Sequence, residues 1–152
     1  MHSGKKKIVF EVPIEPMGQG RGRAVAFLGK ARIYVPDKTR KWQDKFLLMS
    51  SRYMPPGPLR GAVGIDAQFY FRRPQRLNKK KDPETKVPHE GRPDIDNCLK
   101  IVLDSIHPWF EKSDAQVQTV SMSKWYAEKE KLPRVQITIW EIENEHQGSN
   151  NS

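Results

Sequence analysis

Residues 62–71, AVGIDAQFYF, decide the fold, because apolar and polar side chains alternate along them. Alternation with a period of two is typical of a strand with one face on a hydrophobic core and the other toward solvent. The apolar face holds Val63, Ile65, Ala67, Phe69 and Phe71, and the other face holds Asp66, Gln68 and Tyr70. A sheet containing this strand needs a second layer against its apolar face. The neighbouring segments supply candidates for that layer.

Amphipathic helices are predicted on both sides of this strand. Upstream, Trp42, Phe46, Met49 and Tyr53 recur at helical spacing, which predicts a helix that starts at Pro36 and Asp37 and ends before Pro55. Downstream, residues 94–107 predict a second helix, which Pro108 ends. Its apolar positions in helical register are Ile95, Leu99, Val102, Leu103 and Ile106. We expect both stripes to belong to the core.

Further strands are expected at residues 8–12, 31–35, 117–126 and 135–142. This order of elements predicts an α+β fold: a mixed β-sheet with two main helices packed on it, in one dimer-forming domain. The dimer is expected because Cys98 and Ile101 make the second helix apolar on nearly every side, so that two different surfaces must cover it. We place the domain at 8–142, after a basic extension (1–7) and before a disordered polar tail (143–152).

Composition narrows the classes of function. The chain has 152 residues, and Lys+Arg 27 against Asp+Glu 18 give a net charge of +9. A pI near 9.7 favours a nucleic-acid partner. No apolar run is long enough to span a membrane, and no glycine-rich phosphate loop is present, so we expect neither a membrane partner nor a small-molecule cofactor. The single cysteine, Cys98, excludes an intramolecular disulfide and indicates a reducing, cytoplasmic setting.

Basic residues gather in two predicted loops, one around a glycine-rich segment near residue 20 and one over 72–86. Loops commonly carry phosphate contacts, which predicts DNA binding by side chains in both. The residues expected to bind DNA are Arg21, Arg23, Arg72, Arg73, Arg76, Lys79, Lys80 and Lys81. A solvated basic face is the alternative. Pro74, Pro83 and Pro88 exclude a continuous membrane-binding helix in the second cluster.

Candidate catalytic groups occur where the second helix begins. Asp94 and Asp96 are followed one turn later by Lys100, and Asp114 comes further along the chain. Clustered carboxylates suit Mg²⁺, with Mn²⁺ possible, and such an ion completes its shell with substrate phosphate oxygens. Lys100, on the helical face of Asp96, can offer its ammonium to a phosphate. The pattern therefore predicts a metal site acting on a phosphodiester.

A purely structural interpretation of these residues is also open. Asp94 can cap the helix, while Asp96, Lys100 and Asp104 form an exposed ladder of ion pairs, each contributing about 0.2–0.5 kcal/mol. Spacing alone does not separate the two interpretations.

Two runs resemble the RusA family of Holliday junction resolvases: RPDIDNCLK over 92–100, followed by Leu103 and Asp104, and SDAQV over 113–117. The family pattern is Asp-x-Asp-Asn-x-x-Lys, an Asp four residues beyond the Lys, and an Asp-Asp-Ala-Gln-Val-like run before a strand. The runs RVQI (134–137) and YVPDKTR (34–40) are similar to the family's closing strand and to the start of its first helix. Ser113 departs from the pattern, because many members carry a second acid there.

The resemblance implies a homodimeric, Mg²⁺-dependent endonuclease that binds four-way DNA junctions and nicks two strands symmetrically, in a bacterial or phage-infected cell. By position, Asp94, Asp96 and Asp114 become the metal-binding carboxylates and Lys100 the catalytic lysine. Metal-activated water would hydrolyse the phosphodiester. Two alternatives stay open: a non-catalytic, structure-specific DNA-binding protein, and a flap or branch nuclease with the same carboxylate site.

Overall fold

The computed structural model describes residues 5–19, 23–27, 30–34 and 36–143. The strands are β1 (Lys7–Val12), β2 (Arg23–Phe27), β3 (Lys30–Tyr34), β4 (Val63–Phe71), β5 (Val87–Pro88), β6 (Val117–Tyr126) and β7 (Arg134–Glu141). The helices are α1 (Asp37–Ser50) and α2 (Ile95–Ser105), with 3₁₀ turns η1 (Ser51–Tyr53), η2 (Gln75–Leu77), η3 (His107–Trp109) and η4 (Asp114–Gln116).

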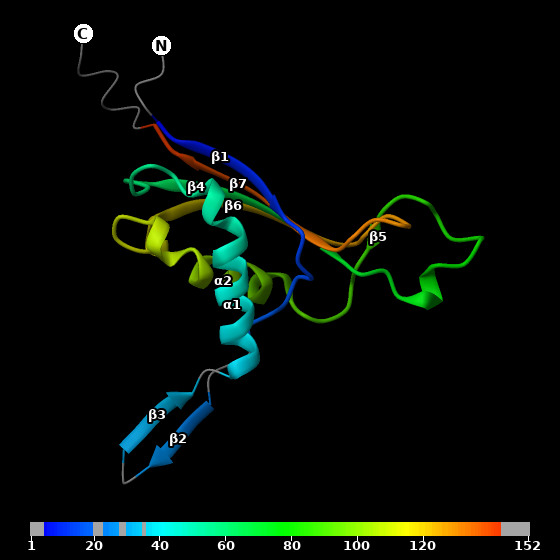
Figure 1. Cartoon of the computed structure of the whole chain (residues 1–152), viewed down its shortest axis with the longest axis horizontal. Coiled ribbons are helices and arrows are strands. Elements are labelled where there is room, and N and C mark those ends of the chain that lie inside the picture. Colours follow the sequence, from blue (N-terminus) through cyan, green and yellow to red (C-terminus); the bar gives the residue numbers. More distant parts are fainter. Residues whose placement is uncertain (1–4, 20–22, 28–29, 35, 144–152) are drawn as a thin grey trace.

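Strand β4 lies at the centre of a five-stranded mixed sheet of order β1-β7-β4-β6-β5. It pairs antiparallel with β7 and parallel with β6, and the parallel connection runs through α2. Strands β2 and β3 form a separate antiparallel hairpin that projects from the body beyond the start of α1 (Figure 1). The predicted α+β, single-domain fold is confirmed.

The core fills the space between the sheet and the two helices, which lie on one side of it (Figure 1). The apolar face of β4 is buried as the alternation predicted, and it packs with residues of α1, α2 and β7. Trp42 and Phe46 are buried, with Met49 and Tyr53 packed beside them, so the predicted stripe of α1 is confirmed. Tyr70 differs: it is on the opposite face, yet only 4% exposed, because Lys86 and Arg134 lie over its ring.

The apolar surfaces of α2 are covered within the chain. Cys98, Leu99, Ile101, Val102 and Ile106 are all buried in the core. The expectation that a second subunit covers one side of this helix is therefore wrong, because α1 and the sheet cover both sides. The dimer itself stays a prediction.

Two strands were not predicted. Strand β2 falls where the sequence predicted a loop, because the six residues between Gly22 and Gly29 give too short a pattern. Strand β5 has two residues and forms only through its pairing with β6. Among the described residues, no helix has both the length and the hydropathy needed to cross a bilayer.

Candidate active site

Asp94 and Asp96 lie exposed at the N-terminus of α2, and neither carboxylate is used to cap the helix. Asp94 is the N-cap residue, with φ −65° and ψ 146°, but its side chain accepts no capping hydrogen bond. An N-cap aspartate normally accepts one from the first turn, which stabilises the helix by about 1 kcal/mol. The carboxylate of Asp94 therefore remains available to a ligand.

The ladder of ion pairs is not observed either. In the described part of the chain, Asp96, Lys100 and Asp104 form no salt bridge with one another, and Lys100 is exposed. Both halves of the structural interpretation thus lack support. The start of α2 presents two carboxylates, with an ammonium group one turn further along the helix.

The loop before Asp94 is held by side chains of the sheet and of the loop itself. Lys124, on β6, donates hydrogen bonds to the carbonyl oxygens of Pro93 (2.7 Å) and Gly91. The N–H of Gly91 donates to Nδ1 of His89 (3.1 Å). Both backbone groups of Gly91 are therefore fixed, three residues before the N-cap residue Asp94.

His89 is buried between aromatic rings. It stacks on Tyr126, with ring centroids 4.1 Å apart, and packs against Phe71 at 4.5 Å. Burial lowers its pKa from the ordinary value, and the positive charges of Lys124 and Arg76 lower it further. His89 is thus a neutral packing residue that orients Gly91.

A second segment packs on the start of α2 from the other side. The N–H of Gln19 donates to the carbonyl of Asn97 (3.1 Å), and a Cβ atom on Gly18 would lie 2.4 Å from Cβ of Pro93. The same segment accepts a hydrogen bond from Nε1 of Trp42 to the carbonyl of Glu15 (2.9 Å). It therefore ties α1 to the turn that carries Asp94.

Cys98 is a buried residue of α2, four positions after Asp94 and two after Asp96. Burial raises the pKa of its thiol to about 12; Lys124 opposes this shift, and the negative charges of Asp96 and Asp94 add to it. The thiol stays protonated at neutral pH, so it is a core group and not a metal ligand.

Asp114 lies exposed in η4, immediately before β6. A capping box holds this turn: the N–H of Ala115 donates to Oγ of Ser113 (3.1 Å), and the N–H of Ser113 donates to Oε1 of Gln116 (3.2 Å). Nε2 of Gln116 donates to the carbonyl of Leu59 (2.9 Å). Ser113, which replaces an acid of the family pattern, therefore has a structural use here.

The structure does not bring Asp114 to the other two aspartates within one chain. Asp94 follows the loop bound by Lys124, near the end of β6, whereas Asp114 precedes the start of that strand. From Val117 to Lys124 an extended strand covers about 23 Å at about 3.3 Å per residue. Consistently, no three His, Cys, Asp or Glu side chains of the described residues are grouped so as to hold a metal ion.

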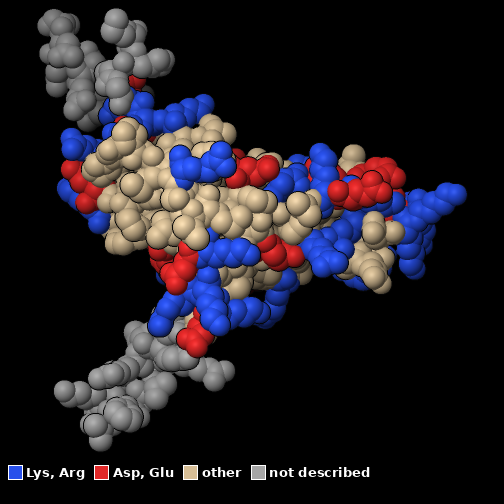
Figure 2. Space-filling model, viewed as in Figure 1, with Lys and Arg blue, Asp and Glu red and all other residues tan. Residues whose placement is uncertain are grey.

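Most of the predicted DNA-binding residues that the structure describes are exposed, but one of them, Arg73, uses its side chain for hydrogen bonds within the chain. Arg72, Arg76, Lys79, Lys80 and Lys81 are exposed on the arm formed by residues 72–86, where Figure 2 shows a concentration of positive side chains. Arg73 is different, because its guanidinium donates to the carbonyls of Ala127 (3.0 Å), Leu77, Pro83 and Thr85. Its side chain therefore holds the backbone of the arm together and does not point to solvent as a free cation. Arg21 lies outside the described residues, and Arg23 begins β2, with its side chain not described.

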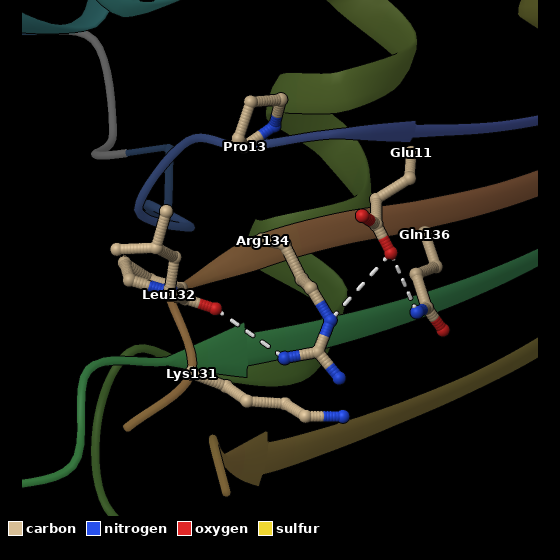
Figure 3. Close-up of a pocket in the computed structure, with 7 residues that line it drawn as sticks. Glu11, Pro13, Lys131, Leu132, Arg134 and Gln136 are labelled. Atoms are coloured by element: carbon tan, nitrogen blue, oxygen red, sulfur yellow. Dashed lines mark hydrogen bonds and ion pairs between the residues drawn. The ribbon is translucent and has the colours of Figure 1, made fainter. Parts of the chain in front are cut away.

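A hollow of about 350 Å³ lies at the opposite edge of the sheet, between the ends of β1 and β7 (Figure 3). Its charged groups satisfy one another: Arg134 pairs with Glu11 (3.6 Å) and Glu128 (3.0 Å), and Gln136 donates to Glu11 (2.8 Å). Because β7 and β4 separate it from β6, this hollow does not adjoin the start of α2.

Comparison with known proteins agrees with this geometry. The family model for endodeoxyribonuclease RusA matches residues 13–140. This range includes both helices and every strand of the five-stranded sheet except β1, with only the last residue of β7 left out. The chain is also 31% identical over 141 residues to the uncharacterized protein YqaN of Bacillus subtilis (strain 168), covering 89% of this chain and 96% of that protein. A match across nearly the whole domain, with the exposed aspartates of α2 inside it, shows that the chain belongs to the RusA family of endodeoxyribonucleases.

Proposed function

We propose that this protein is a Mg²⁺-dependent endonuclease that resolves four-way DNA junctions by paired, symmetric nicks. The observation that carries the proposal is the start of α2, where a held loop presents two exposed carboxylates that neither cap the helix nor form a salt bridge with any described residue. Lys100 lies one turn beyond Asp96, where it can bind a phosphate. Membership of the family supports a nucleic-acid phosphodiester as the substrate.

The donor set fits a hard divalent ion. Asp94 and Asp96 supply carboxylate oxygens, and the one nearby thiol, that of Cys98, is buried and protonated, which favours Mg²⁺ or Mn²⁺ over a thiol-binding metal. Such an ion, when bound, lowers the pKa of a coordinated water and stabilises charge on the phosphate. The chain's own part is to hold the carboxylates outward and to place Lys100 beside them.

Within one chain Asp114 lies far from Asp94 and Asp96, and this separation supports a dimer in which each site takes residues from two copies. On the side of β6 away from β4, β5 pairs only with Trp125 and Tyr126, which leaves the rest of that edge without a described strand. Val120 is 44% exposed along it. We place the twofold axis between Val120 and Ser121, so that antiparallel pairing of two such edges sets residue 117 of one copy opposite residue 124 of the other. The partner's Asp114 then approaches Asp94.

A twofold dimer also suits the substrate. A four-way junction has approximate twofold symmetry, so two equivalent sites can each reach one of two related strands. The exposed arm residues Arg76, Lys79, Lys80 and Lys81 supply charge for phosphate contacts beside each site. Selectivity would then come from junction shape more than from base edges.

The test is cleavage of a labelled synthetic four-way junction with and without Mg²⁺. We expect paired nicks at symmetric positions and no cleavage in EDTA. Asp96→Asn and Lys100→Ala should abolish nicking while they retain junction binding, whereas Lys45→Ala, at an exposed residue of α1, should nick normally. Equal cleavage of flaps and forks would identify a branch nuclease. Junction binding without cleavage under Mg²⁺ or Mn²⁺ would identify a non-catalytic binding protein.

A further inference from the structure

The ammonium group of Lys124 binds backbone carbonyls and no carboxylate of the described residues. Lys124 projects from β6 on the face of the sheet that packs against the helices, since it is in register with the buried Phe69. Its ammonium is bound by two backbone carbonyls, those of Gly91 and Pro93, and it has no carboxylate partner among the described residues. Holding a partly buried ammonium with neutral acceptors costs desolvation energy that a neutral side chain would avoid.

The two carbonyls that Lys124 binds control the path of the chain into α2. Because the peptide bond is planar, fixing the carbonyl of Pro93 also fixes the N–H of Asp94. Asp94 then leaves the loop in an extended conformation, and the helix begins at the next residue. A shift of this loop would therefore move the carboxylate of Asp94 relative to that of Asp96, whose position the helix sets.

We propose that Lys124 is a positioning residue for the carboxylate site: it anchors the loop of residues 91–93 so that Asp94 and Asp96 face one cation together. The inference rests on the proposed function and adds a residue from β6 that the sequence pattern did not single out. Lys124 acts through backbone carbonyls and need not touch the DNA or the metal. Removing a residue that orients metal ligands without binding the metal itself commonly lowers metal affinity by about 10–100-fold.

The chain offers a matched control. Lys129 also donates from Nζ to a backbone carbonyl, that of Lys79 (2.7 Å), and so holds a loop in the same chemical way. That loop is the basic arm and not the turn before Asp94. Lys129→Met therefore removes the same kind of bond without disturbing α2.

The experiment compares Lys124→Met, Lys124→Arg and Lys129→Met with the wild-type protein. Mn²⁺ binding is measured without DNA, by electron paramagnetic resonance, and amide hydrogen exchange is measured for the peptide spanning residues 89–97. We expect Lys124→Met to weaken Mn²⁺ binding about 10-fold or more and to speed exchange in this peptide. Lys124→Arg should restore part of the Mn²⁺ affinity and part of the protection from exchange. Lys129→Met should change neither the Mn²⁺ affinity nor the exchange rate of this peptide by more than about twofold. If Lys124→Met does not fold, Lys124→Gln replaces it.

The outcomes separate this inference from the function on which it rests. A wild-type protein that binds Mn²⁺ and nicks junctions, together with a folded Lys124→Met that binds Mn²⁺ equally well, overturns the role of Lys124 alone. A wild-type protein that neither binds Mn²⁺ nor nicks any branched DNA overturns the proposed function first. Reduced Mn²⁺ affinity with unchanged junction binding in EDTA supports both.

Discussion

His89 couples the stability of the protein to pH at the level of one side chain. Its pKa in the folded state lies below the ordinary value of 6.5, because burial and nearby cations disfavour the charged ring. The unfolded chain therefore binds more protons as the pH falls below about 6.5, and folding becomes less favourable. The contribution of neutral His89 is complete above that pH and is lost on acidification through the folded-state pKa.

We therefore predict that the free energy of unfolding falls between pH 7.5 and about 5.5, and that His89→Gln flattens this fall. Glutamine keeps an acceptor for the N–H of Gly91 but does not titrate. Urea denaturation at the two pH values measures the effect. His107→Gln, at an exposed histidine, is the control and should retain the wild-type slope. A wild-type slope in His89→Gln would mean that another group is responsible.

Gly18 gives a steric prediction at the same scale. A Cβ at this position would meet Pro93 at 2.4 Å, so Gly18→Ala must push the segment away from the turn before Asp94. We expect a loss of about 1–3 kcal/mol in stability, typical of overpacking, together with slower nicking. Gly57→Ala, where no atom lies within 4 Å, should alter neither property. Thermal unfolding and the junction assay, run on both variants, decide the matter.

The sequence predicted the arrangement of the site residues that lie close together at the start of one helix, but not of those whose positions depend on the tertiary structure. Asp94, Asp96 and Lys100 were predicted as neighbours because the period of a helix fixes their relation. The place of Asp114 depends on the length of β6, a tertiary quantity, and its separation from Asp94 was not foreseen. Lys124 was missed because a lone lysine in a strand gives no sign of the two carbonyls that it binds.

At the scale of elements, the arm of residues 72–86 depends on Arg73. Its guanidinium binds four carbonyls, two of them across the loop at Pro83 and Thr85, so it is the hub of a segment with little apolar packing. We predict that Arg73→Met weakens junction binding by loosening the arm. Because Arg73 reaches the DNA only through its neighbours, the variant should also show faster hydrogen exchange over residues 77–86.

A direct phosphate contact behaves differently, and this difference provides the control. Lys80→Met should lower the salt dependence of binding by about one unit of slope and leave hydrogen exchange in the arm unchanged. Titrations of a labelled junction at several salt concentrations, together with exchange data for both variants, separate the two roles. Unchanged exchange in Arg73→Met would show that the arm keeps its shape without this hub.

The elements themselves were predictable where their periodicity is long. Strands β4 and β6 and helices α1 and α2 follow patterns of ten or more residues or clear alternation, and local pattern agrees there with tertiary packing. The surfaces of α2 were misassigned because a residue's hydropathy does not say which neighbour covers it. Here α1 takes the place that a second subunit was expected to fill.

At the scale of the whole molecule, the case for a dimer therefore moves from α2 to β6. One edge of this strand has no described partner strand from Val117 to Lys124, and its two ends carry the two halves of the predicted metal site. An unpaired edge invites association with another strand, and natural proteins usually protect it. Pairing between copies would protect the edge of β6 and assemble the three aspartates in one step.

Mixed dimers test this arrangement directly. If each site takes Asp94 and Asp96 from one copy and the partner's Asp114 from the other, a heterodimer of Asp96→Asn and Asp114→Asn has one wild-type site and one doubly altered site. Co-refolding the two inactive variants should then recover about a quarter of the wild-type nicks, since about half of the dimers are mixed and each has one working site. These nicks should be single and not paired.

The control is a mixture of Asp94→Asn with Asp96→Asn, in which every site of every dimer keeps one altered residue and nicking should remain absent. Denaturing gels of a junction labelled on each strand measure both experiments. Recovery in the first mixture and none in the second would assign Asp114 to the opposite copy. No recovery in the first mixture, with heterodimers verified by differential tags, would mean that one chain supplies all three carboxylates after a rearrangement that carries Asp114 over a distance on the order of 20 Å.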